Sequence, residues 1–307
     1  MHTQTKRNQA EEKRKMQDVI IPPIPTPFVE ERVSPEKLRF NLEKLMSTKV
    51  AGVLALGSNG ESVFLSDKER YIVIETARDA MPADRILVTG TGLESTTKTI
   101  DLTKRAAELG SDYALVGPPH YFKSAMNPEA LYDHYKAVAE SAAIPVIPYN
   151  SPGFTGLNLE PDLIGKLAEH PNIPGVKDGT GNIAQLAELR RVGGSEFFIF
   201  TGNAPTFLAA LFVGINGGMM PITNIVPDQW ANLLGSFRSD NFKEAKRLES
   251  ILLTMTNCIM KYGPGGIKAA MDTLGYYGGS PLRPLKRPAA EGCEEIRKTL
   301  AKVEEAV

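Results

Sequence analysis

Lys177 is the first residue of this chain that could do covalent chemistry. It follows an apolar run at positions 172–176 (NIPGV), which is typical of a short strand that ends at the lysine. Burial would disfavour the charged form and lower the lysine pKa, which makes the neutral amine a nucleophile. Such an amine attacks ketones and forms imines. Taken alone, the same pattern also fits a lysine that simply reaches solvent.

A second polar group, GSNGE at positions 57–61, directly follows another apolar run. Backbone N–H groups at a glycine-flanked turn bind anions, and the Ser58 hydroxyl and Asn59 amide add donors. The ligand that this turn predicts is a carboxylate. An ordinary turn between a strand and a helix, with a capping residue, is the alternative.

Two tyrosines follow two further apolar runs. Tyr121 lies in a proline-stiffened loop at positions 117–122 (GPPHYF), and Tyr149 begins the segment YNSPGFTG at 149–156. Each phenol could pass a proton to or from a substrate hydroxyl. Each could equally be a packed aromatic ring with one hydrogen bond. His120 either contacts substrate from the first loop or lies at the surface.

These residues can act together only in a fold that places the C-terminal ends of its strands close to one another. Short β-rich runs alternate with longer amphipathic ones, which predicts a parallel sheet. The runs cover residues 19–25, 52–56, 86–89, 113–116, 145–148, 173–177, 197–200 and 215–219. Eight strands in about 220 residues favour a closed (β/α)8 TIM barrel, whose active site lies at the C-terminal strand ends. The first run leads into PTPF at 25–28, not into a Gly-rich dinucleotide turn.

Capping residues mark the helix starts. Ser34 precedes Pro35, and Ser66 stands three residues before Glu69, which predicts a capping box. The alternation stops near residue 239, and residues 242–260, 264–274 and 291–303 predict three further helices. We therefore expect a flexible N-terminal tail (1–18), a catalytic barrel (19–239) and a C-terminal helical extension packed on it (240–307).

The composition excludes several classes of function. Lys plus Arg total 35 and Asp plus Glu 36, a balance that predicts neither nucleic-acid nor membrane-surface binding. Two cysteines make no disulfide framework, and four histidines form no ligand pair, so we expect no metal site. No run of 18 apolar residues and no secretory signal is present, so a cytoplasmic protein is expected.

The three motifs together resemble a known family. From about residue 20 to the C-terminus the chain resembles the pyruvate-dependent class I aldolases related to dihydrodipicolinate synthase and N-acetylneuraminate lyase. The resemblance is carried by GSNGE at 57–61, by the Tyr149-Asn150-x-Pro152 turn, by GVKD at 175–178, and by the 28-residue spacing from Tyr149 to Lys177. It implies that Lys177 forms a Schiff base with a 2-oxo acid.

Within the family the chain most resembles 4-hydroxy-2-oxoglutarate aldolase. That branch has Ser-Asn in the carboxylate turn, where the synthases have Thr-Thr, and a late GYYGG motif, here at 275–279. The synthases place an arginine, which holds the carboxylate of the aldehyde substrate, where this chain has Phe154. The 4-hydroxy-2-oxoglutarate aldolases carry a serine where this chain has Gly179.

The resemblance implies catalytic roles for Lys177, Tyr149 and Tyr121. The predicted substrate-binding residues are Gly57, Ser58, Asn59, Gly179 and Met220. The expected reaction cleaves a 4-hydroxy-2-oxo acid, such as 4-hydroxy-2-oxoglutarate, to pyruvate and an aldehyde, without a metal or organic cofactor. Tyr121 is expected to reach a neighbouring subunit of a homotetramer, a dimer of dimers.

Three alternatives stay open at this point. The imine could drive condensation of pyruvate with a semialdehyde, as in dihydrodipicolinate synthase. It could serve a 2-keto-3-deoxy sugar acid aldolase or dehydratase. A pyruvate-binding protein without catalysis is the non-enzymatic reading, because barrels host many functions.

Overall fold

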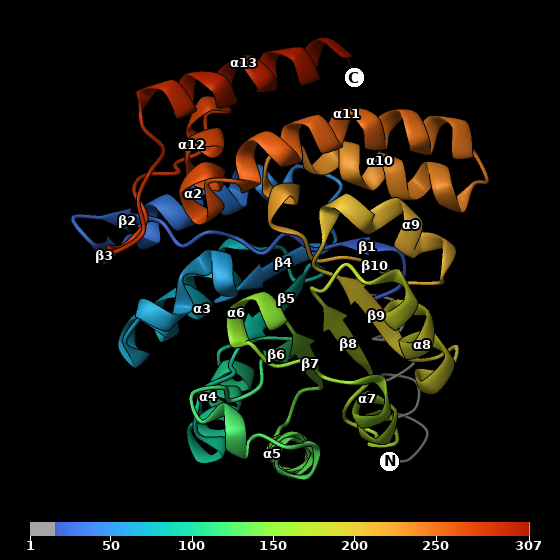
Figure 1. Ribbon diagram of the computed structural model, residues 1–307. Helices are drawn as coiled ribbons and strands as arrows, with labels where there is room; N and C mark the ends of the chain where they lie inside the picture. Colours follow the sequence, from blue (N-terminus) through green and yellow to red (C-terminus); the bar gives the residue numbers. More distant parts are fainter. Residues whose placement is uncertain (1–15, 307) are drawn as a thin grey trace.

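The structure is a computed structural model that describes residues 16–306. Eight parallel strands form one sheet in the order β1-β10-β9-β8-β7-β6-β5-β4 (Figure 1). Their bounds are β1 (Val19–Ile20), β4 (Gly52–Ala55), β5 (Ile86–Gly90), β6 (Tyr113–Val116), β7 (Val146–Asn150), β8 (Gly175–Asp178), β9 (Phe198–Thr201) and β10 (Gly217–Gly218). Beyond β1, the Ile24 N–H donates to the Leu54 carbonyl at 2.9 Å, and Pro23 bridges Leu54. These contacts close the sheet, so the predicted TIM barrel is confirmed.

The first strand is shorter than expected. The apolar run at 19–25 predicted one strand, but regular pairing covers only β1, followed by the single bridge at Pro23. Prolines at positions 22, 23 and 25 interrupt the run, and a proline has no N–H to donate to a ladder. A two-stranded antiparallel hairpin that the sequence did not predict follows it, with β2 (Phe28–Val29) paired to β3 (Arg32–Val33).

Side chains alternate between the inside of the barrel and the surrounding helices, as strand geometry requires. The inner side chains form one buried cluster that includes Leu54, Val88, Leu115, Ile147 and Phe200. In β7 and β8, Tyr149 and Lys177 are direct partners in the parallel register. Tyr149 is packed against the inner cluster, so this pair stands at the top of the barrel interior.

A ring of helices surrounds the strands in Figure 1. These are α2 (Pro35–Met46), α3 (Asp67–Ala80), α4 (Thr96–Glu108), α5 (Pro128–Ser141), α7 (Pro161–Ala168), α8 (Ile183–Gly193), α9 (Phe207–Phe212) and α10 (Pro227–Arg238). Ser34 caps α2, and Ser66 and Glu69 form the predicted capping box at α3. Short helical turns fill the loops: η1 (Ser58–Gly60), η2 (Ser62–Phe64), η3 (Lys123–Ala125), α6 (Pro152–Thr155), η4 (Ala204–Thr206) and η5 (Pro221–Asn224).

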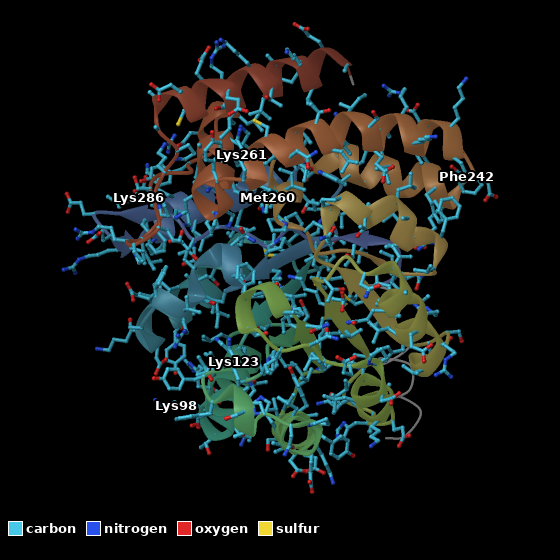
Figure 2. The ribbon with its side chains drawn as sticks, in the orientation of Figure 1. Lys98, Lys123, Phe242, Met260, Lys261 and Lys286 are labelled. Carbon is cyan, nitrogen blue, oxygen red and sulfur yellow. The ribbon has the colours of Figure 1, made fainter. Side chains whose placement is uncertain are left out.

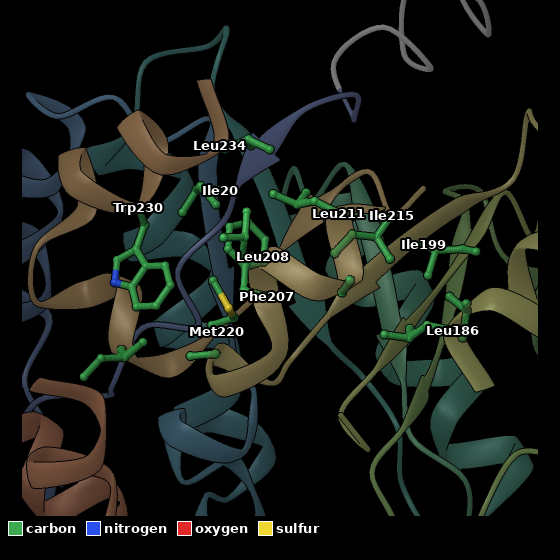
Figure 3. Packing of buried hydrophobic residues seen from close by; sticks show 14 of the residues in the cluster. Ile20, Leu186, Ile199, Phe207, Leu208, Leu211, Ile215, Met220, Trp230 and Leu234 are labelled. Atoms are coloured by element: carbon green, nitrogen blue, oxygen red, sulfur yellow. The ribbon is translucent and has the colours of Figure 1, made fainter. Parts of the chain in front are cut away.

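The main hydrophobic core lies between the strands and this ring. Figure 3 shows part of it under α9 and α10, where Phe207 and Trp230 pack edge to face with ring centroids 5.9 Å apart. Met220 belongs to the same cluster and is fully buried. Aromatic pairs of this geometry stabilise a core beyond their area burial by about 0.5–1.5 kcal/mol.

Three C-terminal helices continue the chain on one side of the ring (Figure 1). They are α11 (Phe242–Met260), α12 (Gly263–Thr273) and α13 (Ala290–Ala306). Helix α11 packs on α10, α13 packs on α11, and α12 reaches η1 beside the barrel mouth. The predicted helices of this segment are therefore present, and one of them contacts a loop that the sequence placed in the site.

Most of the predicted tail lies outside the described residues. Its last residues are described, and Met16 is fully buried in the inner cluster with Val19 and Ile21. The packed chain therefore includes residues on the tail side of the expected boundary at 18, because Met16 covers the bottom of the barrel. No helix within residues 16–306 is long and apolar enough to cross a membrane.

Candidate active site

Lys177 is buried at the centre of the barrel mouth, with 4% of its surface exposed. Its Nζ lies 4.2 Å from the centroid of the Tyr149 ring. Burial lowers the pKa of the Lys177 amine from its ordinary value, while interaction with Tyr149 opposes the shift. The amine is thereby biased toward its neutral, nucleophilic form.

The residue after Lys177 is Asp178, and its hydrogen-bonded carboxylate fixes the end of the strand that carries the lysine. Asp178 is fully buried and faces the helices. It accepts from the Asn150 amide at 2.8 Å and from the Gln185 amide at 2.9 Å. The Thr180 N–H donates to its other oxygen at 2.8 Å. Asp178 therefore ties the ends of β7 and β8 together and holds Lys177 against Tyr149.

A cavity of about 390 Å³ opens in front of Tyr149. Its walls come from the loops after β4, β5, β6 and β7, with a contribution from α12 and the segment that follows it. The polar lining residues include Ser58, Asn59, Glu61, Ser62, Glu94, His120, Tyr149, Ser151 and Thr155, and the apolar ones include Val63, Phe64, Leu93 and Phe154. The volume suits a small organic molecule.

The turn at 57–61 forms one end of this cavity. Ser58 and Asn59 begin the 3-10 turn η1, so their N–H groups have no partner within the turn. The Thr26 hydroxyl donates to the Gly60 carbonyl at 2.7 Å and holds the turn from below. A carboxylate placed here would meet N–H, hydroxyl and amide donors.

Glu61 is the last residue of this turn, and an ion pair anchors it. It adopts a left-handed conformation (φ 55°), which is uncommon for a residue with a side chain. Its carboxylate lies 2.6 Å from the Lys268 ammonium of α12, and both side chains are fully buried. The Leu282 N–H also donates to it at 2.6 Å. The C-terminal extension thus fixes the conformation of the turn.

In the adjacent loop, after β5, Glu94 organises the loop after β6. One carboxylate oxygen accepts the N–H groups of His120 and Tyr121, each at 2.8 Å. The other lies 2.9 Å from Nδ1 of His120. Both Glu94 and His120 line the cavity.

The structure brings part of the predicted site together. Gly57, Ser58, Asn59 and Tyr149 line the cavity, and Lys177 lies directly behind the Tyr149 ring.

Three predicted residues take other positions. Gly179 borders Tyr149, because a Cβ added to it would lie 3.7 Å from Cε2 of that ring. Tyr121 points outward with 77% of its surface exposed. Met220 packs against Gly218 and Phe207 in the core, away from the cavity lining that the described residues form.

Sequence reasoning missed Glu94 and Lys268. Glu94 lies in the loop after β5, so the same strand-end rule, applied to the apolar run at 86–89, would have found it. Lys268 carried no such signal, because it lies inside the amphipathic helix α12, far from the strands in sequence. Within residues 16–306, no group of three or more His, Cys, Asp or Glu side chains is placed to hold a metal ion.

Comparison with known proteins identifies the relatives of this chain. Residues 16–303 match the model of the dihydrodipicolinate synthetase family. A probable mitochondrial 4-hydroxy-2-oxoglutarate aldolase of Emericella nidulans is 35% identical over 262 residues, which cover 84% of this chain and 85% of the relative. A 4-hydroxy-tetrahydrodipicolinate synthase of Syntrophus aciditrophicus is 32% identical over 278 residues, covering 90% and 95%.

Solved structures agree with the fold. A putative dihydrodipicolinate synthetase from Pseudomonas aeruginosa superposes with a TM-score of 0.89 at 28% identity, covering 94% of this chain and 99% of that one. A monomeric dihydrodipicolinate synthase variant superposes with a TM-score of 0.89 at 26% identity, covering 95% and 98%. The relatives thus include proteins named as aldolase and as synthase.

Proposed function

We propose that this chain cleaves a 4-hydroxy-2-oxo acid to pyruvate and an aldehyde. The premise is that the chain belongs to the dihydrodipicolinate synthetase family. It is a lyase-type enzyme, one of the class I aldolases and synthases of that family. The observation that carries this proposal is the buried amine of Lys177 against Tyr149, behind a cavity that ends in the 57–61 turn. 4-Hydroxy-2-oxoglutarate is one acid of this class, and the name of the Emericella nidulans relative supports it.

In the proposed reaction the turn at Ser58 and Asn59 binds the C1 carboxylate. The neutral amine of Lys177 attacks the C2 ketone, and water leaves as the protonated imine forms. This imine is an electron sink, so the chemistry needs neither a metal nor an organic cofactor.

Tyr149 gives its phenolic proton to the departing water, and the resulting phenolate then accepts the proton of the C4 hydroxyl while the C3–C4 bond breaks. The bonding electrons move into the imine as an enamine, and the aldehyde leaves. Protonation of the enamine at C3 and hydrolysis of the imine release pyruvate and restore Lys177. Gly179 borders Tyr149, where its missing side chain leaves room at the reacting centre.

An assembly role for Tyr121 also belongs to the proposal. Tyr121 and Phe122 are exposed aromatic residues on a loop whose first half lines the cavity. In a homotetramer built as a dimer of dimers, Tyr121 would extend the proton relay of a neighbouring subunit. The cytoplasmic location and the binding role of Met220 stay predictions from the sequence.

Borohydride reduction in the presence of pyruvate tests the central step. Trapping of the imine should add one reduced pyruvate to the intact mass, and peptide mass spectrometry should place it on Lys177. The buried Lys268 is the internal control, because its ammonium is paired with Glu61 and should stay unmodified. An unmodified protein at saturating pyruvate would contradict the proposal.

A further inference from the structure

The ion pair of Glu61 and Lys268 lies behind the predicted carboxylate turn. Ser58 and Asn59 line the cavity, whereas the side chain of Glu61, at the end of the same turn, is fully buried against α12. A negative charge at this place would repel a carboxylate bound at Ser58 and Asn59, because charges inside a protein are only weakly screened. The Lys268 ammonium, 2.6 Å from the Glu61 carboxylate, cancels that charge.

A carboxylate bound at the turn would have no lysine or arginine beside it. None of the lysine or arginine residues within 16–306 lines the cavity, and the donors that the turn offers are N–H groups, a hydroxyl and an amide. Lys177 lies behind the Tyr149 ring, and burial lowers the pKa of its amine. The attraction of the turn for a carboxylate therefore depends on the charges placed behind it.

Lys268 is held in place by the GYYGG motif at 275–279, a feature that the proposed function leaves unexplained. A Cβ added to Gly278 would lie 1.8 Å from the Lys268 carbonyl oxygen, so this close approach requires glycine. One residue past the motif, the Ser280 carbonyl accepts a hydrogen bond of 3.2 Å from the Lys268 Nζ. The motif therefore fixes where the ammonium stands.

The segment after the motif connects the ion pair to the cavity wall. The Leu282 N–H donates to the Glu61 carboxylate at 2.6 Å, and Leu285 lines the cavity. The chain then runs close along the start of α12 (Figure 2), where a Cβ added to Gly265 would lie 2.2 Å from the Lys286 carbonyl oxygen. The same segment thus holds Glu61 and closes one side of the site.

We propose that Lys268 is a positioning residue for the 2-oxo acid. By neutralising Glu61 and holding it against α12, it allows the turn at 57–61 to bind the C1 carboxylate. The inference rests on the proposed function, which places this carboxylate at the turn. It gives a lysine and a glycine-rich motif outside the barrel a role in selecting charged 2-oxo acids over neutral ketones.

Two small ketones isolate the contribution of the carboxylate. Pyruvate and hydroxyacetone are both methyl ketones, but only pyruvate carries a carboxylate. Each forms an imine with Lys177 as water leaves, and cyanoborohydride supplies the hydride that reduces the imine to a secondary amine. The rates of adduct formation at low ligand concentration give a pyruvate-to-hydroxyacetone ratio. A loss of folded protein lowers both rates alike, so the ratio reports the carboxylate site.

Three variants change the charge behind the turn in steps. Lys268→Met leaves Glu61 negative, so the ratio should fall by about tenfold or more. Lys268→Met/Glu61→Gln removes both charges, so the ratio should return to the wild-type value. Glu61→Gln alone leaves the ammonium without a counter-charge, so the ratio should rise. Lys302→Met, at an exposed position of α13, removes a lysine far from the turn and should leave the ratio unchanged.

The order of these ratios decides the inference. A ratio that Lys268→Met leaves unchanged, or that the double variant does not restore, would overturn it. If Lys268→Met does not fold, a ratio that Glu61→Gln lowers would overturn it instead.

Calorimetric titration with pyruvate separates this inference from the proposed function, because it measures binding without a covalent step. A wild-type protein that forms no adduct rejects the proposed function, and the affinities of the same variants for pyruvate then test the inference by the same order. Adduct formation combined with ratios that do not follow the charge rejects only this inference.

Discussion

Two lysines lie in the described interior, and they differ in their polar partners. The Lys177 ammonium is 4.2 Å from the centroid of the Tyr149 ring. The Lys268 ammonium is the same distance from the Phe28 ring. Only Lys268 has a carboxylate, that of Glu61 at 2.6 Å; within residues 16–306 no carboxylate pairs with Lys177. Lys268 also donates to the Ser280 carbonyl at 3.2 Å. Aromatic contact is common to both lysines, so these polar partners are the difference.

That difference distinguishes the amine proposed as the nucleophile from a structural one. Burial lowers the pKa of both lysines, but at Lys268 the Glu61 carboxylate opposes the shift by stabilising the ammonium. Lys268 is therefore held as a cation that fixes the turn at 57–61. Lys177 lacks such a partner, so burial biases it toward the neutral amine.

The largest effect should come from removing the unpaired lysine. Lys177→Ala loses the imine, so retro-aldol activity should fall by more than the roughly 10²–10⁴-fold that general acid–base catalysis supplies. Tyr149→Phe should lose an amount within that range and still form a trapped adduct with pyruvate. Steady-state release of pyruvate measures both, with the exposed Lys302→Ala as control. Equal residual activity of the two site variants would contradict this division of roles.

The next effect concerns the paired lysine. Lys268→Met leaves the Glu61 carboxylate buried without a cation, which should destabilise the protein by about 3–5 kcal/mol. Denaturant unfolding measures the loss. The double variant Lys268→Met/Glu61→Gln removes the orphaned charge and keeps an acceptor for the Leu282 N–H, so most of the stability should return. A double variant as unstable as the single one would show that packing, not charge, dominates here.

The unpaired lysine should behave in the opposite way. Lys177→Met removes a buried amine whose charged form is costly, so the melting temperature should rise by about 2–4 °C, the shift that roughly 1 kcal/mol produces in chains of a few hundred residues. A fall in melting temperature at neutral pH would mean that the ring contact outweighs the cost of burial.

Measuring stability over a range of pH also tests the cost of burying the charged form of Lys177. Because the pKa of Lys177 is lowered in the folded state, the unfolded chain binds more protons between that pKa and the ordinary value of 10.5. The cost of burying Lys177 is thus fully present below its folded pKa and disappears as pH rises toward 10.5. The gain from Lys177→Met should shrink over the same interval, in thermal melts at increasing pH.

The rate of adduct formation should follow the same titration. It should rise with pH as the Lys177 amine loses its proton and level off below pH 10.5. Quenching pyruvate mixtures with borohydride at timed intervals measures this rate. A rate still rising steeply at pH 10.5 would indicate an amine with an ordinary pKa.

Periodicity and turn chemistry were sufficient for the scaffold. The strand runs at 86–89 and 113–116 are strands in the structure, and the capping box at Ser66 forms as predicted. The strand at 19–25 was too long, since periodicity does not register the missing N–H groups of consecutive prolines. Lys177 and Tyr149 were found because barrel strands all present their C-terminal ends to one mouth.

Contacts between distant segments were beyond the reach of these rules. Met220 follows a strand like the other predicted site residues, yet the structure packs it in the core under α10. Glu94 holds the loop of His120 and Tyr121, which lies 26 residues further on in the chain. Neither outcome is encoded in local spacing, because both depend on which way a loop turns after its strand.

By itself, the sequence determined the barrel, the strand ends that meet at its mouth, and the candidate nucleophile among them. Alternating apolar runs and glycine, proline and capping residues act on the local backbone. Their effects can therefore be predicted from the sequence alone. Only the tertiary structure decided that Glu61 would pair with Lys268, and Glu94 with His120. Charge compensation depends on distances of a few ångströms between residues that can be more than two hundred positions apart, and folding alone sets those distances.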